Sequence, residues 1–119
     1  MSLLEGALLG ILEDAGETIL TLTEGIEPDE FFASRITQQE TLRQMRIMAE
    51  SAASLPDELK WQMPEIEWSG WAVLDSQLKL VGGFERDALW FAVRSMVPAT
   101  LMWLRVYRKN QPELFSLAV

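Results

Sequence analysis

Acidic side chains are the groups in this sequence whose type and spacing are best suited to chemistry. Glu13, Asp14 and Glu17 lie close together, and the four-residue step from Glu13 to Glu17 puts two carboxylates on one face of a helix. Paired carboxylates can act as general acid and base, or bind two metal ions when Glu-x-x-His motifs complete the site. The sequence contains no histidine, so we favour a solvated acidic face and expect no metal and no cofactor.

Other reactive groups are absent or lack their usual context. The sequence has no cysteine, which excludes disulfides, thiolate metal ligands and cysteine nucleophiles. Without histidine, Ser-His and Cys-His catalytic pairs are excluded as well. Gly82 and Gly83 lack the lysine and the preceding strand of a phosphate-binding loop, so we interpret them as a helix cap.

The aromatic residues show no spacing typical of a cofactor site. We expect most of the five tryptophans in the core or at an interface, with Trp61 and Trp71 the strongest interface candidates. Tyr107 lies beside several basic residues and has two interpretations. It is a modified or nucleotide-stacking residue, or an aromatic whose hydroxyl reaches water at a helix end, and we favour the second.

Charge is distributed unevenly along the chain. The formal net charge of −8 argues against binding of RNA or of anionic membranes by the whole surface. Residues 1–34 contain acidic residues and no Lys or Arg, whereas 86–109 are rich in Arg and contain Asp87 as their one acid. We favour an antiparallel pairing of these two segments, each neutralising the other. The alternative is a basic face for a partner.

Apolar periodicity predicts an all-α fold. The expected helices run over about 4–26, 37–55, 68–81 and 85–108, with short helical turns at 28–34 and after Pro56. No alternating strand pattern occurs in the sequence. We therefore predict an antiparallel bundle of four main helices with short accessory helices, forming a single domain over 1–119 with a tail at about 110–119.

Local signals refine these elements. Thr37 and Glu40 fit a capping box at the start of the second long helix. Pro98 lies inside the last helical pattern and is expected to kink or divide it. Phe31 and Phe32 are expected to cover one end of the bundle. The predicted core stripe of the first helix comprises Leu4, Leu8, Ile11, Ala15, Ile19, Leu22 and Ile26.

The start of the sequence has neither the basic residues of a signal peptide nor an unbroken apolar run. Glu5 and Glu13 interrupt the apolar residues, so no membrane span is expected there and a cytoplasmic location is favoured.

The order of short motifs is similar to that of one known family. The successive segments are Thr21–Gly25, Asp29–Phe32, Ile36–Arg43, Ile47–Ala52, Leu59–Met63, Pro64–Trp68, Ala88–Trp90 and then Pro98. This succession resembles the HepT-like toxins of the HEPN superfamily over about residues 8–107. The resemblance implies a helical bundle that forms homodimers. It also implies a metal-independent RNA-cleaving activity and a minimal nucleotidyltransferase antitoxin as partner.

The same resemblance implies a catalytic motif after the Pro-x-Ile-x-Trp segment, and this sequence does not keep it. Counted from Trp68, the family's arginine corresponds to Asp75 and the polar residue after it to Ser76. Its histidine corresponds to Leu80, and a tyrosine that is adenylylated in some members corresponds to Gly82. Cleavage through a 2′-hydroxyl needs a proton-transfer group and a cation for the phosphate. Asp75 and Leu80 supply neither.

Three functions follow, in order of preference. The first is a non-catalytic HepT-like protein that acts by protein–protein binding, as a dimeric partner or regulatory subunit related to toxin–antitoxin systems. The second is an active ribonuclease toxin that uses other residues, such as Arg86 or Arg94 with Asp75. The third is a structural or assembly domain.

The expected dimer uses the third and fourth long helices, because their large apolar residues exceed what one buried stripe accommodates. The residues that motivate this are Trp71, Leu74, Leu78, Leu80 and Trp90, and Lys79 is assigned to the same dimer or partner interface.

Overall fold

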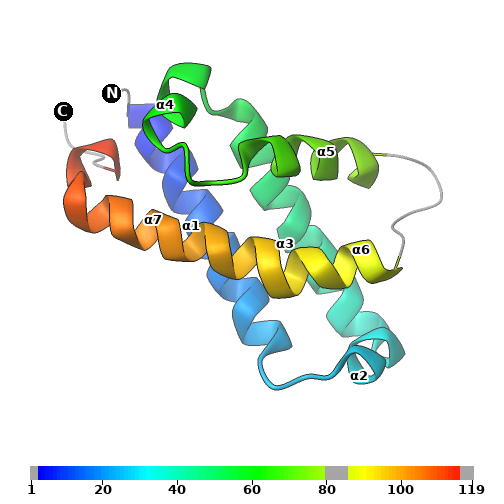
Figure 1. Cartoon of the computed structure of the whole chain (residues 1–119). Helices are drawn as coiled ribbons and strands as arrows, with labels where there is room; N and C mark the ends of the chain where they lie inside the picture. The colour runs from blue at the N-terminus through cyan, green and yellow to red at the C-terminus, as the bar shows by residue number, and fades with distance from the viewer. Residues whose placement is uncertain (1–2, 80–85, 116–119) are drawn as a thin grey trace.

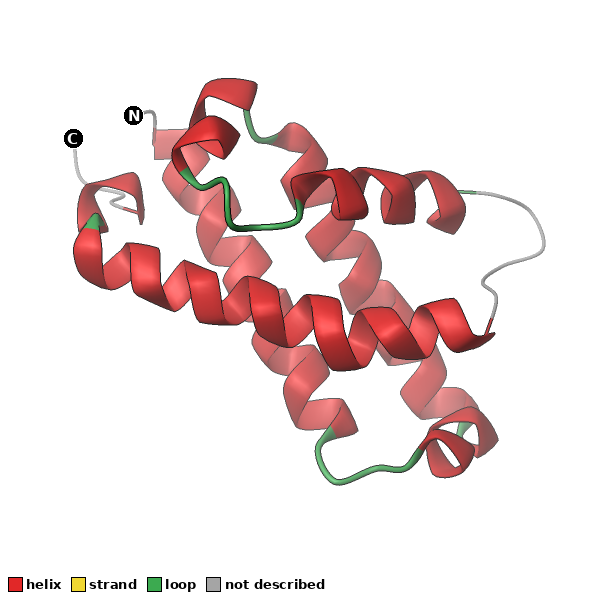
Figure 2. Ribbon diagram, in the orientation of Figure 1, coloured by secondary structure: helices red, strands yellow, loops and turns green. Residues whose placement is uncertain are grey.

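A computed structural model describes residues 3–79 and 86–115, and within these ranges the chain forms helices and connecting loops only (Figures 1 and 2). The elements, in chain order, are α1 (Leu3–Thr23), α2 (Pro28–Ala33), α3 (Arg35–Ser54), α4 (Asp57–Gln62), α5 (Trp68–Leu78), α6 (Arg86–Phe91), the π-helical turn η1 (Ala92–Met96), α7 (Val97–Asn110) and the 3-10 turn η2 (Pro112–Phe115).

The main helices form a bundle in two layers. The pair α1 and α3 makes the most extensive contact, while α5 packs on α3 and α7 packs on α1. In Figure 1 the continuous rod of α6, η1 and α7 lies in front of α1 and α3. The predicted all-α bundle, built on four main helices with short accessory ones, is confirmed.

The predicted core stripe of α1 is confirmed at Ala15 and Ile19 and is wrong in the first half of the helix. Leu9 and Leu12 are fully buried, whereas Leu4 is 67% and Ile11 is 45% exposed. Apolar residues at neighbouring positions allow two rotations of this helix, and the sequence pattern does not distinguish them. Gly16 decides the rotation, because a side-chain carbon there would lie 2.8 Å from Leu101 of α7.

The start of α3 corrects the predicted capping box. The helix begins at Arg35, and its N-cap is Ser34, whose hydroxyl oxygen accepts a hydrogen bond from the Thr37 amide at 3.3 Å. Glu40 binds Arg43 and Gln44 instead of reaching back to Thr37. A Ser three residues upstream of Thr37 gives the same N-cap bond one turn earlier.

The interruption expected at Pro98 is a π-helical turn. The amide of Val97 donates to the carbonyl of Ala92, five residues earlier, and the helix continues in nearly the same direction through α7. Pro98 then falls in the first turn of α7, where a missing amide hydrogen is tolerated.

The short elements close the two ends of the bundle. Phe31 is buried at one end, with its ring centroid 5.3 Å from that of Trp90, and Phe32 packs beside it. Residues 112–115, predicted as part of a tail, form η2 and bury Leu114 and Phe115 against α1 and α7. That part of the prediction is wrong, because the tail carries apolar side chains that the bundle end accommodates.

The predicted neutralisation of the acidic and basic segments is confirmed. Arg105 binds Glu17 at 2.7 Å and Arg108 binds Glu13 at 2.6 Å, so the two helices run antiparallel. Arg86 extends the pairing to Asp29 in α2.

The buried Trp71 side chain makes the first testable prediction. Its indole N–H donates to the Thr100 hydroxyl at 3.0 Å, and both residues are buried. Thr100→Val leaves that N–H without an acceptor, so we expect the free energy of unfolding to fall by about 1–3 kcal/mol. Urea denaturation measures this, and Thr100→Ser, which keeps the hydroxyl, is the control. A loss in Thr100→Ser with no loss in Thr100→Val would show that the methyl packing matters and the hydrogen bond does not.

Candidate functional site

The helix α5 carries Asp75 and Ser76, two of the four positions that the resemblance to HepT-like toxins assigns to a catalytic motif. Its first turn is fixed from the preceding loop: the Trp68 indole donates to the Met63 carbonyl at 2.9 Å, and the Trp71 amide bonds to Glu67. The described part of α5 includes Asp75 and Ser76. The other two motif positions, Leu80 and Gly82, lie outside the described residues.

At the arginine position the structure has a locally neutralised acid. The Asp75 carboxylate binds the Lys79 ammonium at 2.9 Å, one turn along α5, and Asp75 is only 14% exposed whereas Lys79 is 68% exposed. Ser76 donates its hydroxyl to the carbonyl of Ala72 in the same helix. These groups are engaged with one another or with their own backbone.

The predicted interface residues divide into two groups. Trp71, 1% exposed, and Leu74 are buried in the core of the chain, so their assignment to an interface is wrong. The reason is that α5 packs on α3 and also reaches α7 through Trp71, and two neighbours bury more than one stripe. Leu78 and Trp90 are half-buried, and Trp90 packs on the two phenylalanines of α2. Of the two tryptophans first assigned to an interface, Trp61 is exposed.

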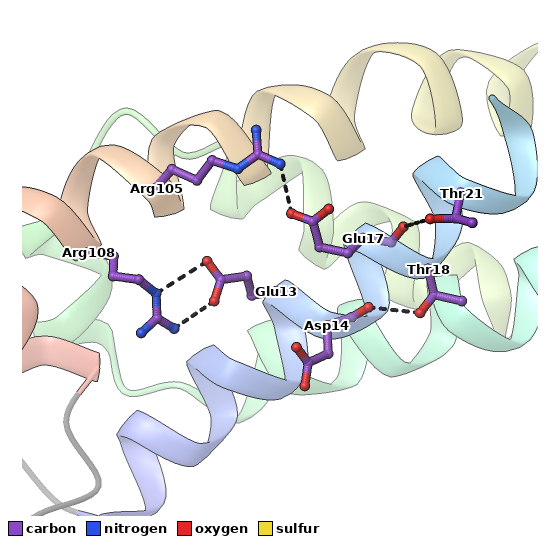
Figure 3. A network of polar contacts seen from close by, with 7 residues as sticks. All are labelled: Glu13, Asp14, Glu17, Thr18, Thr21, Arg105 and Arg108. Carbon is purple, nitrogen blue, oxygen red and sulfur yellow. Dashed lines mark hydrogen bonds and ion pairs between the residues drawn. The ribbon is translucent and has the colours of Figure 1, made fainter. Parts of the chain in front are cut away.

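Two acids of the cluster on α1, Glu13 and Glu17, form ion pairs with arginines of α7. Figure 3 shows Glu13 and Glu17 turned toward Arg108 and Arg105, with the Asp14 carboxylate pointing away from both pairs. Glu13 is only 17% exposed in its ion pair, so the favoured solvated face is wrong for it, whereas Glu17 is paired and still 47% exposed. In the described part of the chain, no group of three or more acidic residues is arranged to hold a metal ion.

The arginines offered for an alternative active site have other partners. Arg86 binds Asp29 and lies 4.3 Å from the ring centre of Phe32. Arg94 donates to the carbonyl of Ile26 and lies 4.8 Å from the ring centre of Trp90. These arginine–aromatic contacts hold the end of α1 and the α2 segment against α6, and the sequence pattern did not reveal them.

An exposed apolar stripe on α6, η1 and α7 was also missed. Phe91 is 60% exposed and Met102 is 48% exposed, and Ala99 and Val106 continue the line; we call these residues the outer stripe. On α5, Val73 is exposed as well. The signal in the sequence was Phe91 and Val106 falling off the core stripe of the last helix.

Tyr107 is held inside the protein rather than at its surface. Its hydroxyl donates to the Glu65 carboxylate, and the residue is buried between α7 and the loop before α5. Burial, together with the hydrogen bond to Glu65, raises the pKa of Tyr107 to about 12. Both interpretations offered from the sequence, nucleotide stacking and a hydroxyl in water, require more exposure than this residue has.

The raised pKa of Tyr107 predicts that the protein loses stability at high pH. A pKa raised in the folded protein favours folding while pH is below the ordinary tyrosine value near 10, and this contribution disappears as pH rises through about 12. We expect Tyr107→Phe to lower the free energy of unfolding by about 1 kcal/mol at pH 7. Urea denaturation from pH 7 to 12 should show the difference between the variant and wild type shrinking above pH 10. A difference that is constant across that range would contradict this assignment.

A comparison with known proteins finds a relative that is named as an RNase. The chain is 28% identical over 92 residues to a Methanocaldococcus jannaschii protein named "Putative RNase MJ0127", an alignment that covers 76% of this chain and 75% of the relative. No protein-family model matches the chain, and no solved structure matches it significantly. Among the described helices, none is both long and apolar enough to cross a membrane.

Proposed function

We propose that this chain is a HepT-like protein of the HEPN type that has lost catalysis and acts by binding other proteins. The observation that carries this is Asp75 in the arginine position of the family motif, partly buried and paired with Lys79. The resemblance further suggests a homodimer and a partner related to the minimal nucleotidyltransferases. We also propose that the whole chain acts as one domain.

The chemistry of RNA cleavage supports the loss of activity. A carboxylate at Asp75 repels a scissile phosphate, where the family motif has a cation. The absence of histidine from the sequence removes the proton-transfer group of that motif. The arginines near the N-terminus of the last helix are bound to Asp29 and to the Ile26 carbonyl.

A second function has support from the comparison. The Methanocaldococcus relative is named as an RNase, so a ribonuclease that uses other residues is the alternative. Its candidates are Arg86, Arg94 and Asp75. The two functions differ in a single property, RNA cleavage by the purified protein.

Ribonuclease activity is the direct test. We expect the wild-type chain at micromolar concentration to leave fluorescently end-labelled single-stranded RNA intact over hours. Asp75→Ala and Arg86→Ala should be indistinguishable from it. The double variant Asp75→Arg, Leu80→His places the family's arginine and histidine at these two positions. Its cleavage of the same RNA is compared with that of wild type. Cleavage by wild type that either alanine substitution abolishes would refute the non-catalytic proposal and establish the ribonuclease.

Counted along the sequence, the outer stripe is centred on Pro98 and Ala99, and the π-helical turn η1 lies on one side of that centre only. Phe91 lies seven residues before Pro98 and Val106 lies seven after Ala99, while Ser95 and Met102 lie three residues away on either side. A two-fold axis beside Pro98 and Ala99 would pair two antiparallel copies of this helix, with Phe91 of one copy against Val106 of the other. The small Ala99 side chain permits close approach at the axis.

Met102→Glu tests the dimer. A charge in the middle of an apolar interface costs far more than it does in water, so we expect wild type at twice the 13.5 kDa chain mass and the variant at the mass of one chain. Light scattering after size exclusion measures both. Because Met102 is half exposed, circular dichroism should show an intact fold. Gln62→Glu on α4 is the matched control and should remain dimeric. A wild-type mass of one chain would overturn the dimer.

A further inference from the structure

A long groove runs between α1 and α3 and has no role in the proposed catalytic remnant or in the outer stripe. Two hollows in it, of about 200 Å³ and about 270 Å³, lie next to each other and share Ile11 of α1 and Ile47 of α3 as lining residues. The first is bordered by Thr18 and Gln44, and the second by Leu8 and Ser54. We call this feature the α1–α3 groove.

The floor of the groove is apolar. Ile11 is 45% exposed, and Leu8 and Ile47 are half-buried beside it. Leu4, 67% exposed, extends the apolar line along α1 beyond Leu8. Exposed aliphatic residues in a continuous line are typical of a surface that another chain covers.

The α1–α3 groove and the contact with α7 lie on different sides of α1. Gly16 faces α7, where it approaches Leu101, and Ile11 is five residues away, about 140° around the helix. A ligand in the groove therefore leaves α7 and its outer stripe uncovered.

The rim of the groove is acidic. Asp14 borders the first hollow and Glu50 borders the second, and both are exposed. Neither carboxylate forms an ion pair with any residue that the structure describes, and Figure 3 shows Asp14 turned away from the arginine pairs. Two hydrogen bonds hold the guanidinium of Arg43 on Glu40. Arg46, exposed and one turn before Glu50 on the same side of α3, lowers the net negative charge of the rim and leaves Asp14 as its unopposed acid.

We propose that the α1–α3 groove binds an amphipathic helical segment of a partner protein, with apolar residues on one face and Lys or Arg beside them. An apolar floor between acidic rims fits such a segment by shape and by charge. The line from Leu4 to Thr18 spans about 21 Å at 1.5 Å per residue, which matches a helix of about 14 residues.

The charge of the rim argues against other occupants. Two copies of the chain joined through this groove would place Asp14 and Glu50 against the same acids, which is repulsive. An anionic lipid surface or a nucleic acid would meet the same repulsion. A basic protein segment gains from both features of the groove.

This inference rests on the proposed protein-binding function and adds to it the surface and the chemistry of the partner. It does not depend on the dimer or on the loss of RNA cleavage, since the Met102 variant tests the dimer and the Asp75 variants test RNA cleavage. Failure of either leaves the groove result standing, and failure of the groove leaves both of those results intact.

The test is titration of the ¹⁵N-labelled chain with an 18-residue synthetic helix of leucine and lysine in amphipathic order. A second peptide with glutamate in place of every lysine is the matched ligand control. We expect the lysine peptide to shift the amide resonances of Leu8, Ile11, Ile47 and Ser51, and the glutamate peptide to leave them unchanged. Equal shifts with both peptides, no shifts, or shifts confined to α7 would overturn the proposal.

Two variants separate the floor from the rim. Ile11→Ser removes an exposed apolar anchor and should weaken binding of the lysine peptide about tenfold. The double variant Asp14→Asn, Glu50→Gln should weaken it at low salt and flatten its dependence on salt concentration. Trp61→Ser, on exposed α4, is the matched control and should bind as wild type does.

Other occupants give distinct results in the same series. Conversion of the dimer to a monomer by Ile11→Ser would identify a second copy as the occupant and refute the proposal. Direct binding of the chain to phosphatidylglycerol vesicles in the absence of peptide, lost in Ile11→Ser, would identify a lipid surface and refute the proposal too. The proposal is supported if Ile11→Ser keeps the wild-type mass and binds the lysine peptide more weakly.

Discussion

The burial of Trp71 is the constraint on which the arrangement of the front of this bundle depends. Its ring fills the space between α5 and α7, and its N–H has a partner in the Thr100 hydroxyl. A large side chain with one polar atom fits a core only where that atom finds an acceptor. This contact fixes the position of α5 relative to α7 together with the hydrogen bond from Tyr107 to Glu65 in the loop before α5.

The orientation of α5 then determines what its other residues can do. With Trp71 and Leu74 turned inward, Asp75 lies at the edge of the buried surface, where the Lys79 ammonium compensates its charge. An acid at the margin of a core with a cation one turn away is a stable structural arrangement. The position to which the resemblance assigns a phosphate-binding arginine thus holds an acid in an ion pair with Lys79.

Ion pairing between α1 and the last helix accounts for the basic residues in the same way. Arg105 and Arg108 bind acids of α1, and Arg86 binds Asp29. Exposed pairs of this kind contribute little to stability individually. Their larger effect is on the surface, since Arg86, Arg105 and Arg108 are paired, whereas Asp14 has no ion-pair partner among the described residues.

The sequence by itself determined the helical class, the main helices and the pairing of the acidic and basic segments. Periodicity and net charge per segment are local properties, and they survive folding. The tertiary structure decided which of two adjacent apolar lines on α1 is buried, through the close approach of Gly16 to Leu101. It also decided that Trp71 is core and Met102 surface, and that Ser34 caps α3 in place of Thr37. These outcomes depend on which neighbours a helix meets on each side, and spacing along one chain does not specify that. Asp75 shows both levels: the sequence placed an acid where the resemblance expects an arginine, and the fold gave it a cation and left its side chain 14% exposed.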